Sequence, residues 1–368
     1  MMTAGIRTRR INRYPFEQAH LFSPWWHGST AHGEAVALLQ TGDGGFADGT
    51  LYFTPERVLR VQSSDGRTAF EPGRDYDVDA ARRRLVLLPG SRIPFLQENQ
   101  LYPAAGRPRS IPHRVHAPDQ NLLYSERWFP GVQVVVDYTH ADPWSGYVPA
   151  RATASLPRTM ERLTHARSLK IAVTGDSITV GANASKTIPP YMPAYVELVR
   201  RGLARSFASR VSALNLARPR VTAEQGVRRI SALAAVKPDL VLVAFGMNDT
   251  HQRDPDGFRR RIATIIDGVR SLRPETEFIL VATSRANPEW HWSPAEEFPR
   301  YAAALRSLTG PGVALADLTA LWTDLLARKR YLDLTGNGIN HPNDFGHRLY
   351  AQTLLALLVG SSPSALLA

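Results

Sequence analysis

Ser177 follows an apolar, strand-like run, Leu169–Thr174, in the sequence Gly175-Asp176-Ser177. A serine on a sharp turn after a buried strand exposes its hydroxyl, which can attack a carbonyl carbon when a base lies within hydrogen-bond reach. The same position also suits a serine that only caps a helix. The sequence therefore predicts that Ser177 is either a nucleophile or an N-cap.

Asn248 occupies a comparable place after a second apolar run, Leu240–Phe245, in the sequence Gly246-Met247-Asn248-Asp249. Gly246 permits a tight turn at the end of the strand. An asparagine amide there can donate to the oxyanion of an acyl-transfer reaction. The alternative is an ordinary Asx turn without a catalytic role.

Two further candidate residues are the histidines of the segment Asn337–His347. His341 stands in a loop just before the last predicted helix, where a neutral imidazole can serve as the general base of a serine. His347 falls inside that helix. We therefore expect His341, rather than His347, to be the base.

The elements that must position these residues alternate between apolar strands and helices from Leu169 onward. The expected strands are 169–174, 210–214, 240–245, 278–282 and 313–316, and the expected helices are 191–207, 223–235, 258–272, 295–308, 318–328 and 344–358. Such alternation predicts an α/β fold whose parallel sheet has helices on both faces. Ligands bind beyond the carboxyl ends of such strands, which is where Ser177 and Asn248 are expected.

The first part of the chain has a different pattern. Short alternating runs, such as 35–40, 58–62, 84–88 and 132–139, are separated by clusters of Gly, Pro and Asp. This spacing is typical of a β-sandwich or jelly roll. We expect a β-domain over residues 1–150, a connector over 151–168 and the α/β domain over 169–368.

The three segments, in this order and each at a predicted sheet edge, resemble the SGNH (GDSL-type) hydrolase family over Leu169–Leu358. The resemblance implies a flavodoxin-like α/β fold and a serine hydrolase. It implies Ser177 as nucleophile, His341 as base, and an oxyanion hole made by the Asn248 side chain and the Ser177 backbone N–H.

Two positions depart from the family pattern. The family's second block has a glycine whose N–H completes the oxyanion hole, and Arg220 takes that place within Asn215–Thr222. Its backbone N–H can still donate, and its side chain can reach a substrate. The family usually has an aspartate three residues before the histidine, where this chain has Gly338. Asp333 can fold back to orient His341, or a backbone carbonyl can do so in a Ser–His dyad, which would leave Asp333 as a solvated loop carboxylate.

Trp290 and Trp292 follow the fourth expected strand of the α/β domain. Tryptophans on such a loop can stack on a sugar ring or line an acyl pocket, which makes both candidate substrate-binding residues. The alternative is that they pack an interface between the two domains.

Composition limits the remaining possibilities. The 368 residues are 43% hydrophobic and 21% charged, as in globular proteins, and contain no cysteine, which removes thiolate catalysis and thiolate metal sites. The net charge of +11 comes from scattered short arginine runs rather than an aromatic-interleaved basic stretch, so we expect no nucleic-acid partner. We also expect no metal, no cofactor and no membrane segment, and the sequence indicates no oligomeric state. The N-terminus lacks a signal-peptide pattern, which favours the cytoplasm, with secretion as the alternative.

A β-sandwich before an SGNH domain is similar to the layout of carbohydrate esterase family 2, which implies removal of acetyl groups from an acetylated carbohydrate. The sequence therefore predicts a serine acetylesterase that works through an acyl-enzyme on Ser177. The alternatives are a lipid or thioester hydrolase of the GDSL type, and a catalytically dead module that binds glycans.

Overall fold

The computed structural model describes residues 18–42, 45–112, 114–115, 117–125, 129–185, 194–292 and 294–360. Its second half is built on five parallel strands in the order β13-β12-β14-β15-β16. Their bounds are β12 Leu169–Gly175, β13 Val211–Asn215, β14 Leu240–Ala244, β15 Glu277–Ala282 and β16 Val313–Asp317. The predicted parallel α/β sheet is confirmed.

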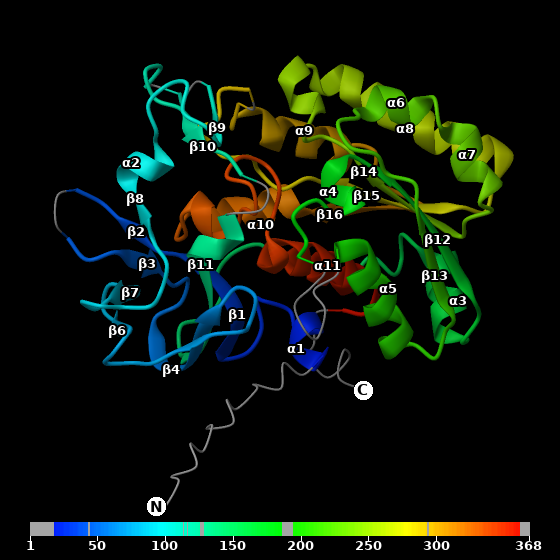
Figure 1. The fold of residues 1–368 in the computed structure, drawn as a ribbon. Helices are drawn as coiled ribbons and strands as arrows, with labels where there is room; N and C mark the ends of the chain where they lie inside the picture. The colour runs from blue at the N-terminus through cyan, green and yellow to red at the C-terminus, as the bar shows by residue number, and fades with distance from the viewer. Residues whose placement is uncertain are drawn as a thin grey trace, which may run out of the picture.

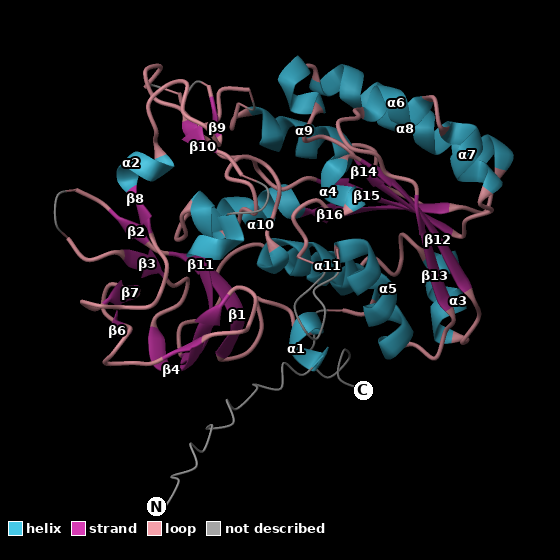
Figure 2. Cartoon of the chain, in the orientation of Figure 1, coloured by secondary structure: helices cyan, strands magenta, loops and turns pink. Residues whose placement is uncertain are grey.

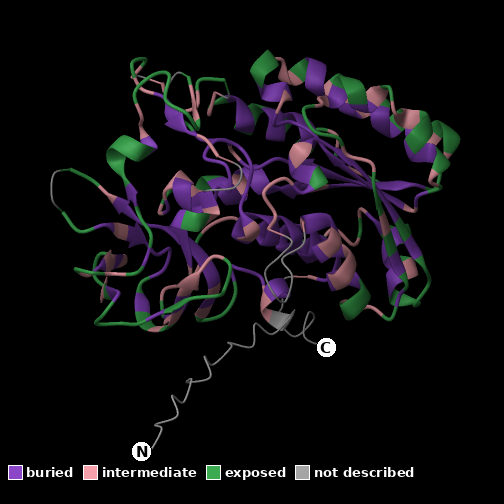
Figure 3. Ribbon diagram, in the orientation of Figure 1, coloured by how far each residue is buried: buried purple, intermediate pink, exposed green. Residues whose placement is uncertain are grey.

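The central strands are apolar throughout because both of their faces are covered. In β14, Leu240 and Leu242 belong to one buried cluster, whereas Val241 and Val243 belong to another on the opposite face. Figure 3 shows the strands of this sheet as buried, with the exposed residues on the outer sides of the helices. The edge strand β13 is the exception, since most of its residues are at least partly exposed.

Helices cover both faces of this sheet (Figure 1), and α6, α7, α8 and α9 lie together on one of them. The helices are α3 Pro157–Thr164, α4 Ser177–Val180, α5 Tyr195–Ser206, α6 Ala223–Val227, α7 Ile230–Ala235, α8 Pro255–Leu272, α9 Glu297–Arg306, α10 Leu318–Leu326 and α11 Asp344–Leu358. Polar side chains cap several of them, as Asn343 does for α11 by accepting the N–H of Gly346 at 3.0 Å.

The helix expected over 223–235 is two helices, because α6 ends and α7 begins around Arg228 and Arg229. The expected connector 151–168 contains α3, whose Met160 and Leu163 are buried. Within the described residues, no helix combines the length and the apolar character needed to cross a bilayer.

The first part of the chain is β-rich, as Figure 2 shows. One antiparallel sheet has the order β1-β11-β4-β5, and a second, mixed sheet has the order β6-β7-β3-β2-β8 with β2 and β8 parallel. The strands are β1 Thr30–Ala37, β2 Leu39–Gln40, β3 Asp48–Thr50, β4 Pro55–Ser63, β5 Ala69–Phe70, β6 Tyr76–Asp79, β7 Arg84–Leu87, β8 Leu96–Gln97 and β11 Gln133–His140. The short pair β9 Ser110–Ile111 and β10 Leu122–Leu123 lies apart, and the short helices are α1 Gln18–Phe22 and α2 Glu98–Leu101. The sandwich or jelly-roll topology stays a prediction.

The two parts share one hydrophobic core. Val134 and Tyr138 of β11 belong to the same buried cluster as Trp322 of α10 and Leu349 of α11. A fully buried ion pair between Lys329 and Glu34 also joins them. The parts are therefore packed as one body, although their sheets differ.

Candidate active site

Ser177 lies at the first position of α4, directly beyond the carboxyl end of β12. The turn requires Gly175, because a Cβ there would stand 2.5 Å from the carbonyl oxygen of Ala244. Asp176 caps the helix by accepting the N–H of Ile178 at 3.0 Å. The N-cap is therefore Asp176 and not Ser177, and the first N–H groups of α4, including that of Ser177, have no partner within the helix.

The structure brings Ser177 and His341 together. The Ser177 Oγ is 2.9 Å from Nε2 of His341, although the residues are 164 positions apart. Asn337 shapes the histidine loop, because its Oδ1 accepts the N–H groups of Ile339, Asn340 and His341 at 3.0, 3.0 and 3.1 Å. His341 is only 9% exposed. A histidine in this position can take the proton of the serine hydroxyl.

His347 does not reach the serine. It lies in α11, is fully buried, and its Nε2 is 2.9 Å from the carbonyl oxygen of Ala182. His347 therefore contacts the loop that follows α4.

The other ring nitrogen of His341 meets a residue that the sequence analysis did not single out. Nδ1 of His341 is 2.8 Å from Oδ1 of Asn183, on the turn after α4. The contact depends on two loops far apart in the chain, so no local pattern identifies it. Asn183 itself has φ +62°, a conformation that asparagine tolerates better than most residues.

The hypothesis that Asp333 orients His341 is wrong. The Asp333 carboxylate is fully buried and accepts the N–H groups of Ala37 at 2.7 Å and Arg330 at 3.0 Å. It also lies 3.6 Å from Nζ of Lys329. Asp333 is thus neither a triad acid nor a solvated carboxylate, because it joins the two parts of the protein.

Asn248 contacts the turn that carries Arg220, beside the turn of Ser177. The Asn248 amide donates one hydrogen to the carbonyl of Val221 at 2.8 Å, and a carboxamide has a second to give. The turn before Val221 is fixed by the Arg218 N–H, which donates to the carbonyl of Gly175 at 3.0 Å. Arg220 itself has φ +62°, the left-handed conformation that glycine adopts most easily. This agrees with its alignment to a family glycine.

Two buried carboxyl groups lie behind these turns. Burial and the nearby charge of Asp249 raise the pKa of Asp176 to about 7. Burial raises the pKa of Asp249 to about 6, although N–H donors from Ala223 and Gly246 oppose the shift. Both groups accept backbone N–H bonds, and so they brace the turns that carry Ser177 and Asn248.

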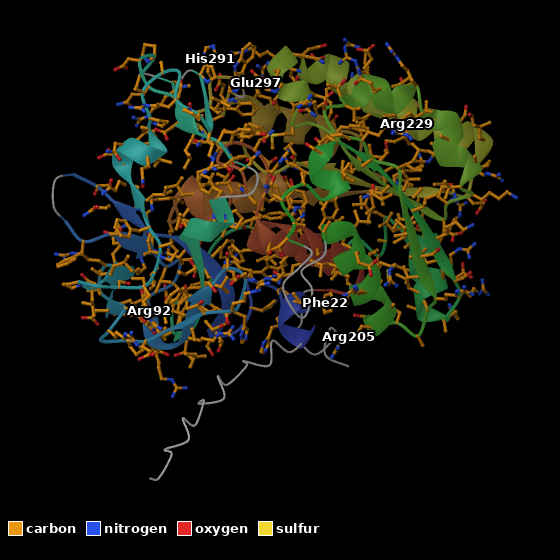
Figure 4. The ribbon with its side chains drawn as sticks, viewed as in Figure 1. Phe22, Arg92, Arg205, Arg229, His291 and Glu297 are labelled. Carbon is orange, nitrogen blue, oxygen red and sulfur yellow. The ribbon has the colours of Figure 1, made fainter. Side chains whose placement is uncertain are left out.

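The two tryptophans have different surroundings. Trp290 packs against the main core and meets the His251 ring edge-on, with the ring centres 5.5 Å apart. Trp292 is 60% exposed, and its carbonyl contacts the His251 ring. Figure 4 labels His291, which lies between them, near Glu297 on the upper side of the molecule. Trp290 therefore fits the packing alternative, and Trp292 is available to a ligand.

Loops of the β-rich part reach this edge of the sheet. The carboxylate of Glu289 accepts from Nε of Arg114 at 3.0 Å and from the Tyr102 hydroxyl at 2.8 Å. The Ser125 N–H donates to the Asn337 carbonyl at 3.2 Å. The first part thus forms one wall beside the histidine loop. The described residues contain no group of three or more metal-ligating side chains.

The chain was compared with known protein families and sequences. Residues 173–349 match the model of the GDSL-like Lipase/Acylhydrolase family. Comparison with curated protein sequences gives no match.

Several solved structures are similar over part of the chain. A two-domain esterase (CEX) active on acetylated mannans is 23% identical with a TM-score of 0.46, and the alignment covers 58% of this chain and 55% of that one. LAE5, a hydrolase from the metagenome of Lake Arreo, is 21% identical with a TM-score of 0.44, covering 54% and 98%. The acetyl xylan esterase AlAXEase is 19% identical with a TM-score of 0.41, covering 51% and 98%.

Proposed function

We propose that this protein removes O-acetyl groups from poly- or oligosaccharides. Its residues 173–349 match the model of the GDSL-like lipase/acylhydrolase family, which indicates a carboxylic ester hydrolase. The observation that carries the proposal is the 2.9 Å contact between Ser177 Oγ and His341 Nε2 at the edge of the sheet. This contact supplies both a nucleophile and its base.

The proposed mechanism uses the groups described above. Nε2 of His341 takes the proton as Ser177 Oγ attacks the ester carbonyl. The oxyanion accepts hydrogen bonds from the Ser177 N–H, the second N–H of the Asn248 amide and the Arg220 N–H. The imidazolium gives its proton to the leaving sugar hydroxyl, and an acyl-enzyme remains. His341 then activates a water, which releases acetate and restores the serine.

The surface near the site supports a carbohydrate as the alcohol part of the ester. An open groove of about 540 Å³ is lined by Asn99, Gln100, Tyr102, Pro103, Ala104, Arg107, Pro108, Arg109 and Leu123. Amide and guanidinium groups are suited to sugar hydroxyls, and the prolines give flat surfaces for sugar rings. Leu123 links this groove to the site, because its carbonyl packs against Gly338, three residues before His341. The β-rich part, a jelly-roll-like unit in our interpretation, would then hold the glycan chain beside the serine.

The test is acetate release from acetylated xylo-oligosaccharides by the wild type and by Ser177→Ala. We expect release by the wild type only. Release by both proteins would remove the serine mechanism.

A series of 4-nitrophenyl esters with increasing acyl length separates the alternatives. A preference for long acyl chains over acetyl would favour a lipid hydrolase. No Ser177-dependent turnover of any ester, together with retained glycan affinity, would favour a binding module.

A further inference from the structure

Asn183 is held with its amide oxygen toward the catalytic histidine. Its Nδ2 donates to the carbonyl of Gly336 at 3.0 Å, and its Oδ1 lies 2.8 Å from Nδ1 of His341. A carbonyl oxygen only accepts hydrogen bonds, so the contact with Gly336 fixes which end of the amide is nitrogen. Nδ1 of His341 must then carry a hydrogen and donate it. This leaves the Nε2 lone pair facing the hydroxyl of Ser177.

The turn that carries Asn183 is fixed on both sides. The Ala182 N–H donates to the carbonyl of Ser177 at 3.0 Å, and its own carbonyl is 2.9 Å from Nε2 of His347. Two residues after Asn183, the Ser185 N–H donates to Oδ1 of Asp344 at 2.8 Å. The turn is thus tied to the nucleophile helix and to the first turn of α11. Its geometry does not depend on the His341 contact alone.

The position three residues before the histidine is closed to a larger residue. Gly338 has φ +95°, and a Cβ there would stand 2.3 Å from the carbonyl oxygen of Leu123 and 3.1 Å from the ring of Phe129. Both neighbours belong to the β-rich part of the chain. An aspartate at 338 would therefore strain the backbone and would also require Leu123 and Phe129 to move.

We propose that Asn183 is the positioning residue of His341, so that the site works as a Ser177–His341–Asn183 arrangement whose orienting group is uncharged. This inference rests on the proposed function of the site. The β-rich part fills the space at Gly338, and the turn after α4 supplies the orienting group from the other side of the ring.

An uncharged partner has a chemical consequence. The amide oxygen selects the tautomer and holds the ring, as asparagine does in some cysteine proteases, but it adds no negative charge beside the imidazolium. A carboxylate at the same place would favour the protonated ring and raise the pKa of the base. Other titratable groups near this turn include Asp344 and His347 of α11, Asp176, and the Tyr195 and Arg348 side chains that act on His347 and Asp344. All of them are retained in the variants below.

The experiment compares Asn183→Gly and Asn183→Asp with the wild type, using 4-nitrophenyl acetate as the probe across a range of pH. Glycine suits the positive φ, so this variant removes the amide without straining the backbone. We expect Asn183→Gly to lower kcat by about 100-fold with KM nearly unchanged, as for a misplaced base. We expect Asn183→Asp to keep substantial activity and to move the acidic limb of kcat/KM upward by about one pH unit or more.

The control compares the single variant Asn183→Gly with the double variant that carries both Asn183→Gly and Gly338→Asp. We expect the second substitution to lower the melting temperature and not to restore kcat, because position 338 is closed. Unchanged kcat in Asn183→Gly, or an acidic limb that stays in place in Asn183→Asp, would overturn the inference. Ser177→Ala is measured in parallel: turnover that survives this substitution would contradict the proposed function itself, whereas its loss confines any failure to Asn183.

Discussion

Glu289 of the α/β part and Arg114 of the β-rich part form an ion pair of 2.9 Å, next to the loop that carries Trp290. The Tyr102 hydroxyl donates to the same carboxylate, and the Arg114 guanidinium lies over the Tyr102 ring at 3.5 Å from its centre. The Val115 N–H adds a backbone bond to the Glu289 carbonyl at 3.0 Å. The loop after β15, which carries the tryptophans, is therefore fixed to the wall that the β-rich part provides.

Glu289→Gln should weaken this attachment without touching the reacting groups. We expect KM for an acetylated oligosaccharide to rise several-fold, whereas kcat for 4-nitrophenyl acetate stays near that of the wild type. Since both side chains are partly exposed, the loss of stability should be about 1 kcal/mol or less. Equal effects on the large and the small substrate would contradict a role of this wall in glycan binding.

Asn248→Ala tests the oxyanion hole. Removing one donor of this kind typically lowers kcat by about 10²–10³-fold. We expect a loss of that size with little change in KM, because the donor acts mainly in the transition state. Asn215→Ala is the matched control, since its amide donates to the Thr179 carbonyl on the same side of the sheet and not to the reacting ester. Similar losses in both variants would show that Asn248 acts through the fold.

Arg220→Gly tests whether this position contributes only its backbone N–H. Glycine keeps that donor and removes the cost of the left-handed conformation, which is about 1–2 kcal/mol for other residues. We expect retained kcat for 4-nitrophenyl acetate and a higher melting temperature. Arg220→Ala should keep kcat without the gain in stability. A large loss of kcat in both variants would instead assign a role to the arginine side chain.

Asp176→Asn tests the pH dependence of stability. The pKa of Asp176 is about 7 in the folded protein, against 3.8 for the exposed group, so the folded state binds its proton more tightly. The free energy of unfolding should therefore decrease as pH rises from about 4 to about 7. The amide does not titrate, and its oxygen can still accept the Ile178 N–H. In Asp176→Asn, we expect the decrease in the free energy of unfolding between these pH values to be smaller than in the wild type by at least about 1.4 kcal/mol, the equivalent of one pKa unit. Denaturant titrations at several pH values measure this difference. An identical decrease in both proteins would show that groups other than Asp176 cause the pH dependence of stability.

The sequence by itself was sufficient to predict the parallel sheet and the pairing of Ser177 with His341. Apolar strands buried on both faces have a recognisable composition, and the order of strands and helices from residue 169 determines where the strand ends must meet. Ser177 and Asn248 each follow a strand of that pattern, and His341 precedes its last helix. The meeting of Ser177 and His341 agrees with this order of elements.

Only the tertiary structure decided which residue contacts Nδ1 of His341. Asp333 and Asn183 are both polar loop residues near candidate segments, and nothing in their local sequence separates them. The choice depends on packing between distant parts: the β-rich part draws Asp333 toward Ala37, and it fills the space at Gly338. The turn after α4 then places Asn183 against His341. Contacts between segments more than a hundred residues apart leave no periodic signal in the sequence, so they emerge only when the chain is folded.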